Sequence, residues 1–220
     1  MTGLVAISVT CGRYVPSTPN SKSEAAILIV TFLSTLFLEL EFAIYMGVLL
    51  SLVFFLKRTS TPEIPTMSIN VDEKTKKRCF INIQKKPVKQ CPQLKIIRID
   101  MSIYFGSINH VQNRISHIVE NEHIYHIMID ASRINLIDLA AAEALVSENN
   151  ILKKYGGGLY FVGLKSSVYE FIAKSCFVKK IGADHFFDSK GKAISNIYNM
   201  MLDRKICRSC QSQIFKECNE

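Results

Sequence analysis

Three cysteines in the last segment of this 220-residue sequence have the spacing of metal ligands. Cys207 and Cys210 form a Cys-x-x-Cys pair, which suits one edge of a tetrahedral zinc site, and Cys218 offers a third thiolate. The tail contains no fourth Cys or His, so a closed site needs a donor from elsewhere, such as His185. Two alternatives stay open: a redox pair or iron–sulfur ligands, and reduced thiols that only pack. The seven cysteines are odd in number and scattered, which argues against a disulfide framework.

Two carboxylates interrupt a long apolar stretch. Glu39 and Glu41 are the only charged residues between Ala25 and Leu56. One straight helix over that stretch would be about 48 Å long, against about 30 Å of hydrocarbon in a bilayer, and would hold both carboxylates in lipid at a high cost. We therefore expect a bend near them, between the helices Ala26–Leu38 and Phe42–Leu56. The two carboxylates then either form the turn at an interface or face a pathway for ions.

Asp138 directly precedes the segment Leu139–Tyr155, which has the apolar spacing of a helix. At that position its carboxylate is expected to cap the helix by accepting a backbone hydrogen bond. An anion or nucleotide at the same helix start would meet the backbone N–H groups of Ala140 and Ala141 but no basic side chain. No Ser/His/Asp, Cys/His or paired-carboxylate pattern stands out, so we expect no enzyme activity.

The positive charge is concentrated just after the apolar stretch. Residues 57–98 contain eleven basic and three acidic residues, which accounts for the whole net charge of +8. Such a cluster next to an apolar segment is typical of the cytoplasmic side of a membrane protein and attracts anionic lipid headgroups. Lys57 and Arg58 therefore predict that the domain after the helices lies in the cytoplasm. Because the cluster is next to the membrane and no recognition motif accompanies it, we expect no nucleic-acid partner.

The remainder of the chain alternates predicted strands with predicted helices. Strands are expected at 80–83, 96–101, 125–129 and 159–162, and helices at 107–121, 139–155, 166–174 and 190–202. This alternation predicts an α/β domain with a central, mostly parallel sheet and flanking helices. The expected organisation is a divergent segment 1–24, a transmembrane helix pair 25–56, a basic linker 57–78, the α/β domain 79–203 and a Cys-containing tail 204–220.

Two blocks of this sequence resemble a known family. Residues Thr31–Glu41 and Ala43–Val48 resemble the final helix pair of the SulP sulfate permeases. Ile134–Leu145, followed by Gly157-Gly158 and Val162–Lys165, resembles the STAS domain that these permeases carry at their cytoplasmic carboxyl end. Both blocks occur in the family's order, and the similarity runs from about residue 24 to the end of the chain.

The resemblance implies the carboxyl-terminal part of an anion transporter whose substrate binds among earlier helices. We therefore expect a truncated member at the cell membrane that does not transport alone, because two short helices cannot enclose a polar pathway through lipid. Its STAS domain would be a cytoplasmic module for regulation and assembly. The expected partners are membrane lipid, the remaining transporter helices or a second protomer, and a protein bound through the STAS domain. The alternative is a self-standing, membrane-anchored STAS protein that binds another protein or senses nucleotides.

STAS domains also occur in anti-sigma-factor antagonists, where a Ser follows the Asp at the start of the central helix and accepts a phosphate. Here Leu139 takes that place and Ala140 the next one. A leucine cannot be phosphorylated, so the resemblance implies no phosphoacceptor at this position, and Asp138 keeps its expected role as a cap. Apart from zinc at Cys207, Cys210 and Cys218, no cofactor is expected.

Overall fold

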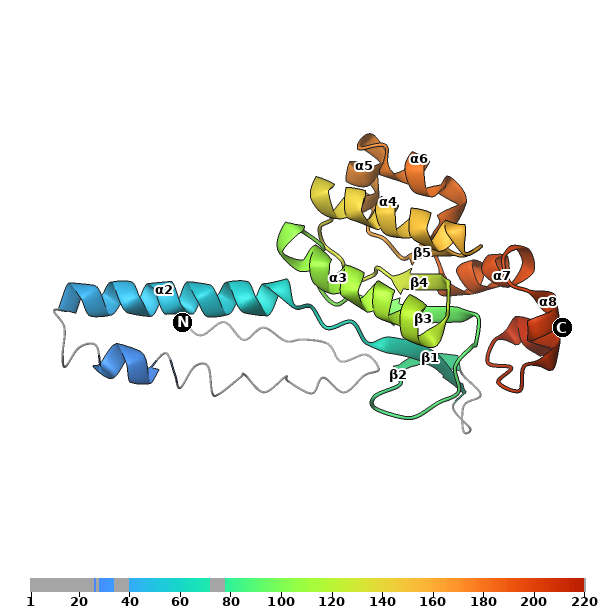
Figure 1. Cartoon of the computed structure of the whole chain (residues 1–220), viewed down its shortest axis with the longest axis horizontal. Helices are drawn as coiled ribbons and strands as arrows, with labels where there is room; N and C mark the ends of the chain where they lie inside the picture. Colours follow the sequence, from blue (N-terminus) through green and yellow to red (C-terminus); the bar gives the residue numbers. More distant parts are fainter. Residues whose placement is uncertain (1–25, 27, 34–39, 72–77, 220) are drawn as a thin grey trace, which may run out of the picture. The chain divides into compact units, whose positions relative to one another are not determined.

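The computed structural model of the chain describes residues 26, 28–33, 40–71 and 78–219. The chain separates into two compact units, residues 1–56 and 57–220, which are described here one after the other (Figure 1). Two of the predicted features, the divergent segment 1–24 and Glu39, lie outside the described residues.

Most of helix α2, Leu40–Ser60, belongs to the first unit. Within the described residues, the part of α2 from Glu41 to Ser60 is the one helix long and apolar enough to cross a membrane, with a mean hydropathy of 1.6. A short helical piece, residues 28–33, packs against it. A Cβ atom placed on Gly47 would lie 3.2 Å from the Thr31 Oγ1 atom, so this glycine lets the two helices approach closely, as small residues do in membrane helices.

The predicted bend near the two carboxylates falls at residues outside the described ones, and of the two carboxylates Glu41 is described. Helix α2 begins at Leu40, includes Glu41 in its first turn and continues past the predicted end at Leu56 to Ser60. A carboxylate in the first turn interacts favourably with the positive end of the helix dipole, and Lys57 and Arg58 do the same at the other end. These charges therefore suit the two ends of α2.

A six-stranded sheet with the order β2-β1-β3-β4-β5-β6 forms the second unit. The strands β3 to β6 are parallel to one another, whereas β1 runs antiparallel to both of its neighbours. The expected α/β fold is therefore confirmed, with a mixed sheet whose central part is parallel. The strands are β1 Thr66–Val71, β2 Arg78–Asn82, β3 Leu94–Arg98, β4 His126–Asp130, β5 Gly158–Val162 and β6 Phe186–Phe187.

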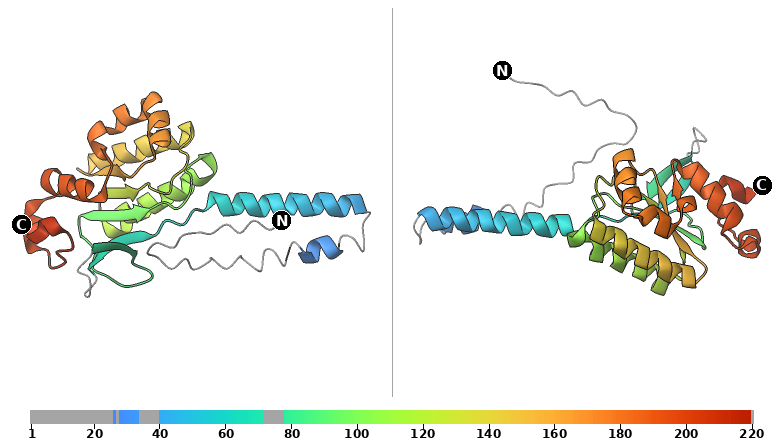
Figure 2. Two further views of the ribbon diagram at one scale, coloured as in Figure 1. Left: turned by 180° about the vertical axis from the view of Figure 1, so that it is seen from behind. Right: turned by 90° about the horizontal axis from the view of Figure 1, so that it is seen from above.

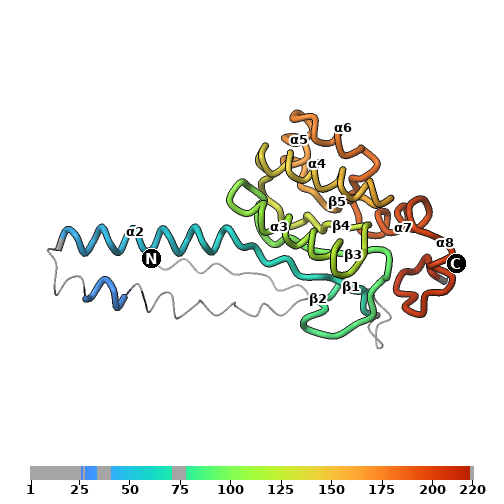
Figure 3. Tube along the Cα trace, in the orientation of Figure 1, coloured from blue at the N-terminus to red at the C-terminus, as the bar shows by residue number. Residues whose placement is uncertain are grey.

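Helices flank both faces of this sheet, and Figure 2 shows α3 and α4 on the opposite side from α7 and α8. A π-helical turn, Ile118–Glu122, extends α3, and short 3-10 turns occur at Ala183–His185 and Lys216–Asn219. The last described residues turn back beside α8 (Figure 3). The helices are α3 Phe105–His117, α4 Leu139–Lys154, α5 Ser166–Lys174, α6 Phe177–Ile181, α7 Lys190–Met200 and α8 Arg204–Ser209.

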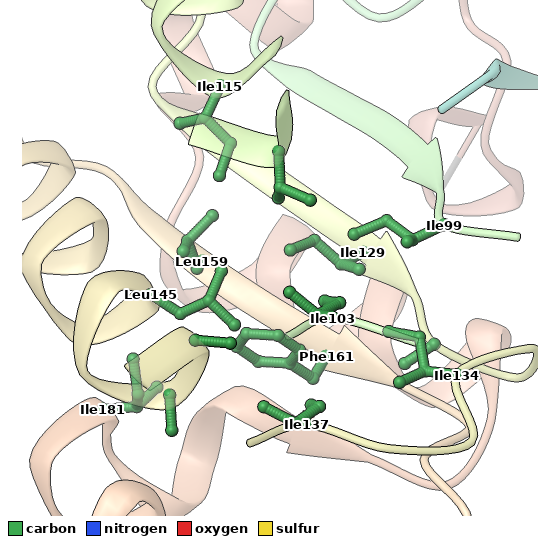
Figure 4. Close-up of a cluster of buried hydrophobic side chains, with 14 of the residues drawn as sticks. Ile99, Ile103, Ile115, Ile129, Ile134, Ile137, Leu145, Leu159, Phe161 and Ile181 are labelled. Carbon is green, nitrogen blue, oxygen red and sulfur yellow. The ribbon is translucent and has the colours of Figure 1, made fainter. Parts of the chain in front are cut away.

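Alternate residues of the central strands point into two separate core clusters. In β4, Ile127 and Ile129 belong to the cluster beneath α3 to α6, which Figure 4 shows in close-up. Met128 between them belongs to the second cluster, with Ile194 and Ile197 of α7. Because both faces of the strand are covered, its sequence is apolar throughout, as in other buried parallel sheets.

Part of the predicted basic linker 57–78 is a strand. Residues 66–71 form β1, which pairs with β2 from Met67 to Val71 and with β3 at Thr66 and Met67. Its first three side chains are buried and the next two are half-buried, so β1 lacks the alternation by which a strand is recognised in a sequence. The short elements β6, α6 and α8 were not predicted either, because segments of two to six residues show no recognisable period.

Candidate docking surface at the start of helix α4

The Asp138 carboxylate caps two helices at once. Its Oδ1 atom accepts a hydrogen bond of 2.7 Å from the N–H of Ala141, so the predicted cap of α4 is confirmed. Its Oδ2 atom accepts a second one, of 2.9 Å, from the N–H of Phe105, the first residue of α3. One side chain therefore satisfies free N–H groups at the starts of both helices and holds these starts together.

Backbone hydrogen bonds join the two loops that lead into these helices. The strands β3 and β4 are parallel neighbours, so the loops after them leave the same edge of the sheet. The N–H of Ile103 donates to the carbonyl oxygen of Leu136 at 2.9 Å, and the N–H of Asp138 donates to that of Ile103 at 3.2 Å. The side chains of Ile103 and Ile137 are fully buried, which fixes both loops on the core.

Three large apolar side chains on this joined pair of loops are exposed. They are Phe105 (77% exposed), Leu139 (53%) and Leu136 (49%), and we call them the α4-entry patch. Asp138 connects the backbones of the first two, and the Ile103 hydrogen bond connects the third. Single exposed apolar residues are common, but a group of them on one rigid edge is typical of a surface that contacts another protein or a membrane.

Positively charged side chains lie close to the α4-entry patch. Arg133, which is 59% exposed, is 3.4 Å from the Asp100 carboxylate, and Lys165 is hydrogen-bonded to the side chain of Asn135. Arg98 holds the same Asp100 through two hydrogen bonds, of 2.5 and 2.8 Å. These hydrogen bonds raise the pKa of Arg98, so its charge is fixed.

Leu139, at the place of the phosphoacceptor, is the first residue of α4. Its exposed side chain carries no hydroxyl group, and neither does that of Ala140. Leu139 therefore offers an exposed apolar side chain and no group that could accept a phosphate.

A second polar cluster at the carboxyl end of the sheet was missed by the sequence analysis. Asp130 ends β4 and is almost fully buried, and its carboxylate lies 2.5 Å from the Lys190 Nζ atom and accepts a 2.7 Å hydrogen bond from the Ser132 hydroxyl. Burial raises the pKa of Asp130, but the hydrogen bonds from Lys190 and Ser132 outweigh burial and lower it. The contact ties the start of α7 to the sheet, so its role is structural.

The predicted metal ligands are only partly brought together. Cys207 lies in α8, Cys210 directly after it, and Cys218 in the last 3-10 turn. His185, suggested as a fourth ligand, is buried elsewhere: its Nδ1 atom is 2.6 Å from the Leu159 carbonyl oxygen and its ring stacks on Tyr160. Among the described residues, no three His, Cys, Asp or Glu side chains are arranged around a metal position.

A small pocket of about 230 Å³ lies at the carboxyl ends of β5 and β6. Aromatic rings, including Phe161, Tyr169 and Phe186, form much of its wall, and its charged lining residues are Glu170 and Asp188. The described residues that line it include no Lys or Arg, so nothing here attracts the phosphates of a nucleotide.

Comparison with known proteins agrees with this architecture. The profile of the STAS domain matches residues 85–193. The Bacillus subtilis protein YvdB is 28% identical over 169 residues, which cover 76% of this chain and 29% of YvdB. Sulfate transporter 1.1 of Arabidopsis thaliana is 25% identical over 178 residues, covering 74% of this chain and 26% of that protein.

The solved structures show the same fold. The murine Slc26a9 anion transporter in its inward-facing state superimposes with a TM-score of 0.69 at 20% identity, covering 82% of this chain and 29% of that one. The chain thus spans less than a third of the length of these relatives. The STAS match and the sulfate-transporter relatives together show that the chain belongs to the SulP family and carries a STAS domain.

Proposed function

We propose that this chain is the carboxyl-terminal part of a SulP-type anion transporter. In this role the STAS domain is a cytoplasmic, non-catalytic module for regulation and assembly, which contacts the membrane part of the transporter and does not bind the transported anion. The observation that carries this function is the α4-entry patch, an exposed apolar surface built on a rigid pair of helix starts.

The position of the patch in the chain supports a partner at the membrane. Tyr104, which directly precedes Phe105, donates a 2.9 Å hydrogen bond from its hydroxyl to the Thr59 Oγ1 atom. Thr59 lies in the last turn of α2, where the candidate membrane span ends. This contact joins the start of α3, next to the patch, to Thr59, a residue of the same compact unit that follows the apolar part of α2 in the sequence.

The exposed surface of α2 supports the same function. Apolar side chains around the whole helix are exposed, among them Phe42, Val48 and Phe55. In a bilayer such a helix is covered by lipid or by other transmembrane helices. Membrane location and further transporter helices as partners are therefore part of the proposal.

Uptake measurements test the transport part of the proposal. We expect vesicles that contain this chain alone, with insertion confirmed, to take up labelled sulfate and bicarbonate no faster than empty vesicles. Helix α2 and the short helical piece 28–33 are too few to enclose a polar pathway through lipid. Saturable uptake by the chain alone would contradict the modular role.

A chimera tests the docking part. The matching region of Arabidopsis sulfate transporter 1.1 is replaced by residues 41–220, and sulfate uptake by cells is measured with the amount of chimera in the membrane. We expect Leu139→Arg to lower uptake about fivefold or more, the lower end of common coupling effects between sites. The matched control is Ile151→Arg on the same helix, which is 40% exposed and outside the patch, and it should leave uptake unchanged.

Equal uptake by both variants would mean that the patch does not contact the transporter. That result would favour the alternative, a self-standing anchored STAS protein whose patch binds a different protein.

A further inference from the structure

The small pocket at the carboxyl ends of β5 and β6 is built on a rigid frame. The two strands pair in parallel, with Phe161 opposite Phe186. The loop after β5 is tied to β6, because the N–H of Gly163 donates a 2.9 Å hydrogen bond to the carbonyl oxygen of Phe187. In α/β proteins, small ligands commonly bind beyond the carboxyl ends of parallel strands. The pocket is therefore preformed, and it lies at an edge of the sheet that suits a ligand.

Aromatic rings from two strands and one helix form the apolar wall of this pocket. The ring of Phe161 stacks on that of Phe186, with the ring centres 5.2 Å apart. Tyr169 of α5 meets Phe186 edge to face at 5.8 Å. Phe161 is fully buried and Tyr169 is 38% exposed, so the wall extends from the core to the surface. The faces of such rings carry partial negative charge and attract cations.

Two carboxylates stand beside these rings. Glu170 follows Tyr169 in α5, Asp188 comes directly after β6, and both line the pocket. Among the residues that the structure describes, neither carboxylate takes part in an ion pair, and this includes Lys174, one helical turn after Glu170. No cation of the described chain therefore balances the two negative charges.

The two lysines nearest to the pocket in the sequence are bound elsewhere. Lys165, just before α5, is hydrogen-bonded to the side chain of Asn135 in the loop before α4. Lys190 at the start of α7 lies 2.5 Å from the Asp130 carboxylate, which ends β4. The pocket thus combines aromatic rings with free negative charge, and its lining contains no Lys or Arg.

We propose that this pocket binds a small organic cation, such as a free alkylammonium compound. The alkyl groups of such a cation pack on the rings, and its positive charge is attracted both by the ring faces and by Glu170 and Asp188. Pockets for drug-sized ligands measure about 300–1,000 Å³. This one measures about 230 Å³ and therefore suits a smaller molecule. The same carboxylates repel anions, so the inference goes beyond the proposed anion-transporter role and does not depend on it.

Isothermal titration calorimetry of the full chain tests the proposal, with choline as the probe. The chain is kept in a maltoside detergent, because a detergent with a choline headgroup would compete. We expect choline to bind with a dissociation constant of about 1 mM or lower. The matched probe is the uncharged dimethylbutanol in which carbon replaces the ammonium nitrogen of choline. It has the same shape and should bind at least about fivefold more weakly, since it lacks the charge.

Variants locate the binding in the pocket. Tyr169→Ala should raise the dissociation constant for choline about fivefold or more, whereas Tyr169→Phe keeps a ring and should change it less than about twofold. Glu170→Gln combined with Asp188→Asn should raise it by about threefold to fivefold. The matched control is Glu143→Gln, which is exposed on α4 and outside the pocket and should leave the constant unchanged.

The unmodified chain decides the proposal even where a variant fails to fold. Absence of binding heat at millimolar choline, or equal affinity for choline and the uncharged probe, would overturn it, as would unchanged affinity in Tyr169→Ala. Phosphocholine carries a phosphate that the two carboxylates repel, so it should bind at least about threefold more weakly than choline. Equal binding would assign the pocket to a lipid headgroup and overturn a free cation as its ligand. None of these readouts involves transport, so they can fail or succeed separately from the proposed function.

Discussion

Replacing Asp138 should destabilise the STAS domain by more than the loss of an ordinary helix cap. An Asp-to-Ala change at a helix cap costs about 1 kcal/mol. Asp138 caps both α3 and α4, so Asp138→Ala should lower the free energy of unfolding by about 2 kcal/mol, if the two caps contribute independently. Asp138→Asn keeps one carbonyl oxygen and should lose about half of that amount.

Urea unfolding of the full chain in mild detergent measures the change. The chain has no Trp, so loss of structure is followed by far-ultraviolet circular dichroism. The matched control is Ser189→Ala, since Ser189 caps α7 by accepting one hydrogen bond, of 3.4 Å, from the Lys192 N–H. We expect this control to lose about 1 kcal/mol or less.

A loss for Asp138→Ala no larger than that for Ser189→Ala would refute the shared cap. If the loss is as expected, the same variant also tests the patch, because Phe105 and Leu139 are then no longer held at one edge. Sulfate uptake by the chimera should fall in proportion to the unfolded or loosened fraction and recover partly in Asp138→Asn.

Two further predictions concern other parts of the domain. Gly157→Ala should destabilise the domain by about 1–3 kcal/mol, because a Cβ atom there would lie 2.1 Å from the Tyr125 carbonyl oxygen. A Cβ atom on Gly191 in α7 would meet nothing within 4 Å, so Gly191→Ala should stabilise the domain by up to about 1 kcal/mol. Thermal unfolding of both variants measures these changes, and equal shifts of the two melting temperatures would contradict the prediction. Burial, and to a lesser degree the charge of His185, lower the pKa of His126. The unfolded state therefore binds a proton at His126 more readily than the folded state, and the free energy of unfolding should fall as the pH drops below about 6.5 towards the lower folded pKa. The urea midpoint, plotted against pH in this range, should change less steeply in His126→Gln than in the unmodified chain. An unchanged slope would exclude His126 as the source of the pH dependence.

The central part of the fold could be predicted because its sequence repeats a strong pattern. The strand around Ile127 and Ile129 is apolar on both faces, and α4 combines an apolar stripe with an Asp at its start. Such signals depend only on neighbouring residues. Strand β1 lacks them, since its pairing with β2 and β3 depends on residues far away in the sequence.

The candidate surfaces were less predictable for the same reason. The sequence indicates Asp138 as a cap of α4, but the second hydrogen bond, to Phe105, exists only because parallel strands bring two loops to one edge. The sequence also suggests the three tail cysteines as zinc ligands, and this stays a prediction, because among the described residues no three such side chains are arranged around a metal position. Exposure of Phe105 and Leu136 cannot be read from residue type alone.

The position of Phe215 has a consequence for synthesis on the ribosome. Strands β3 to β5 can pair, and the cluster beneath α3 to α6 can form, before the tail is made. The second core cluster, by contrast, is completed only by Phe215 and by the Gln93–Asp203 contacts. The emerging domain therefore leaves part of the second core cluster uncovered until Phe215 has left the exit tunnel. During that interval it is a natural client for chaperones that bind nascent chains.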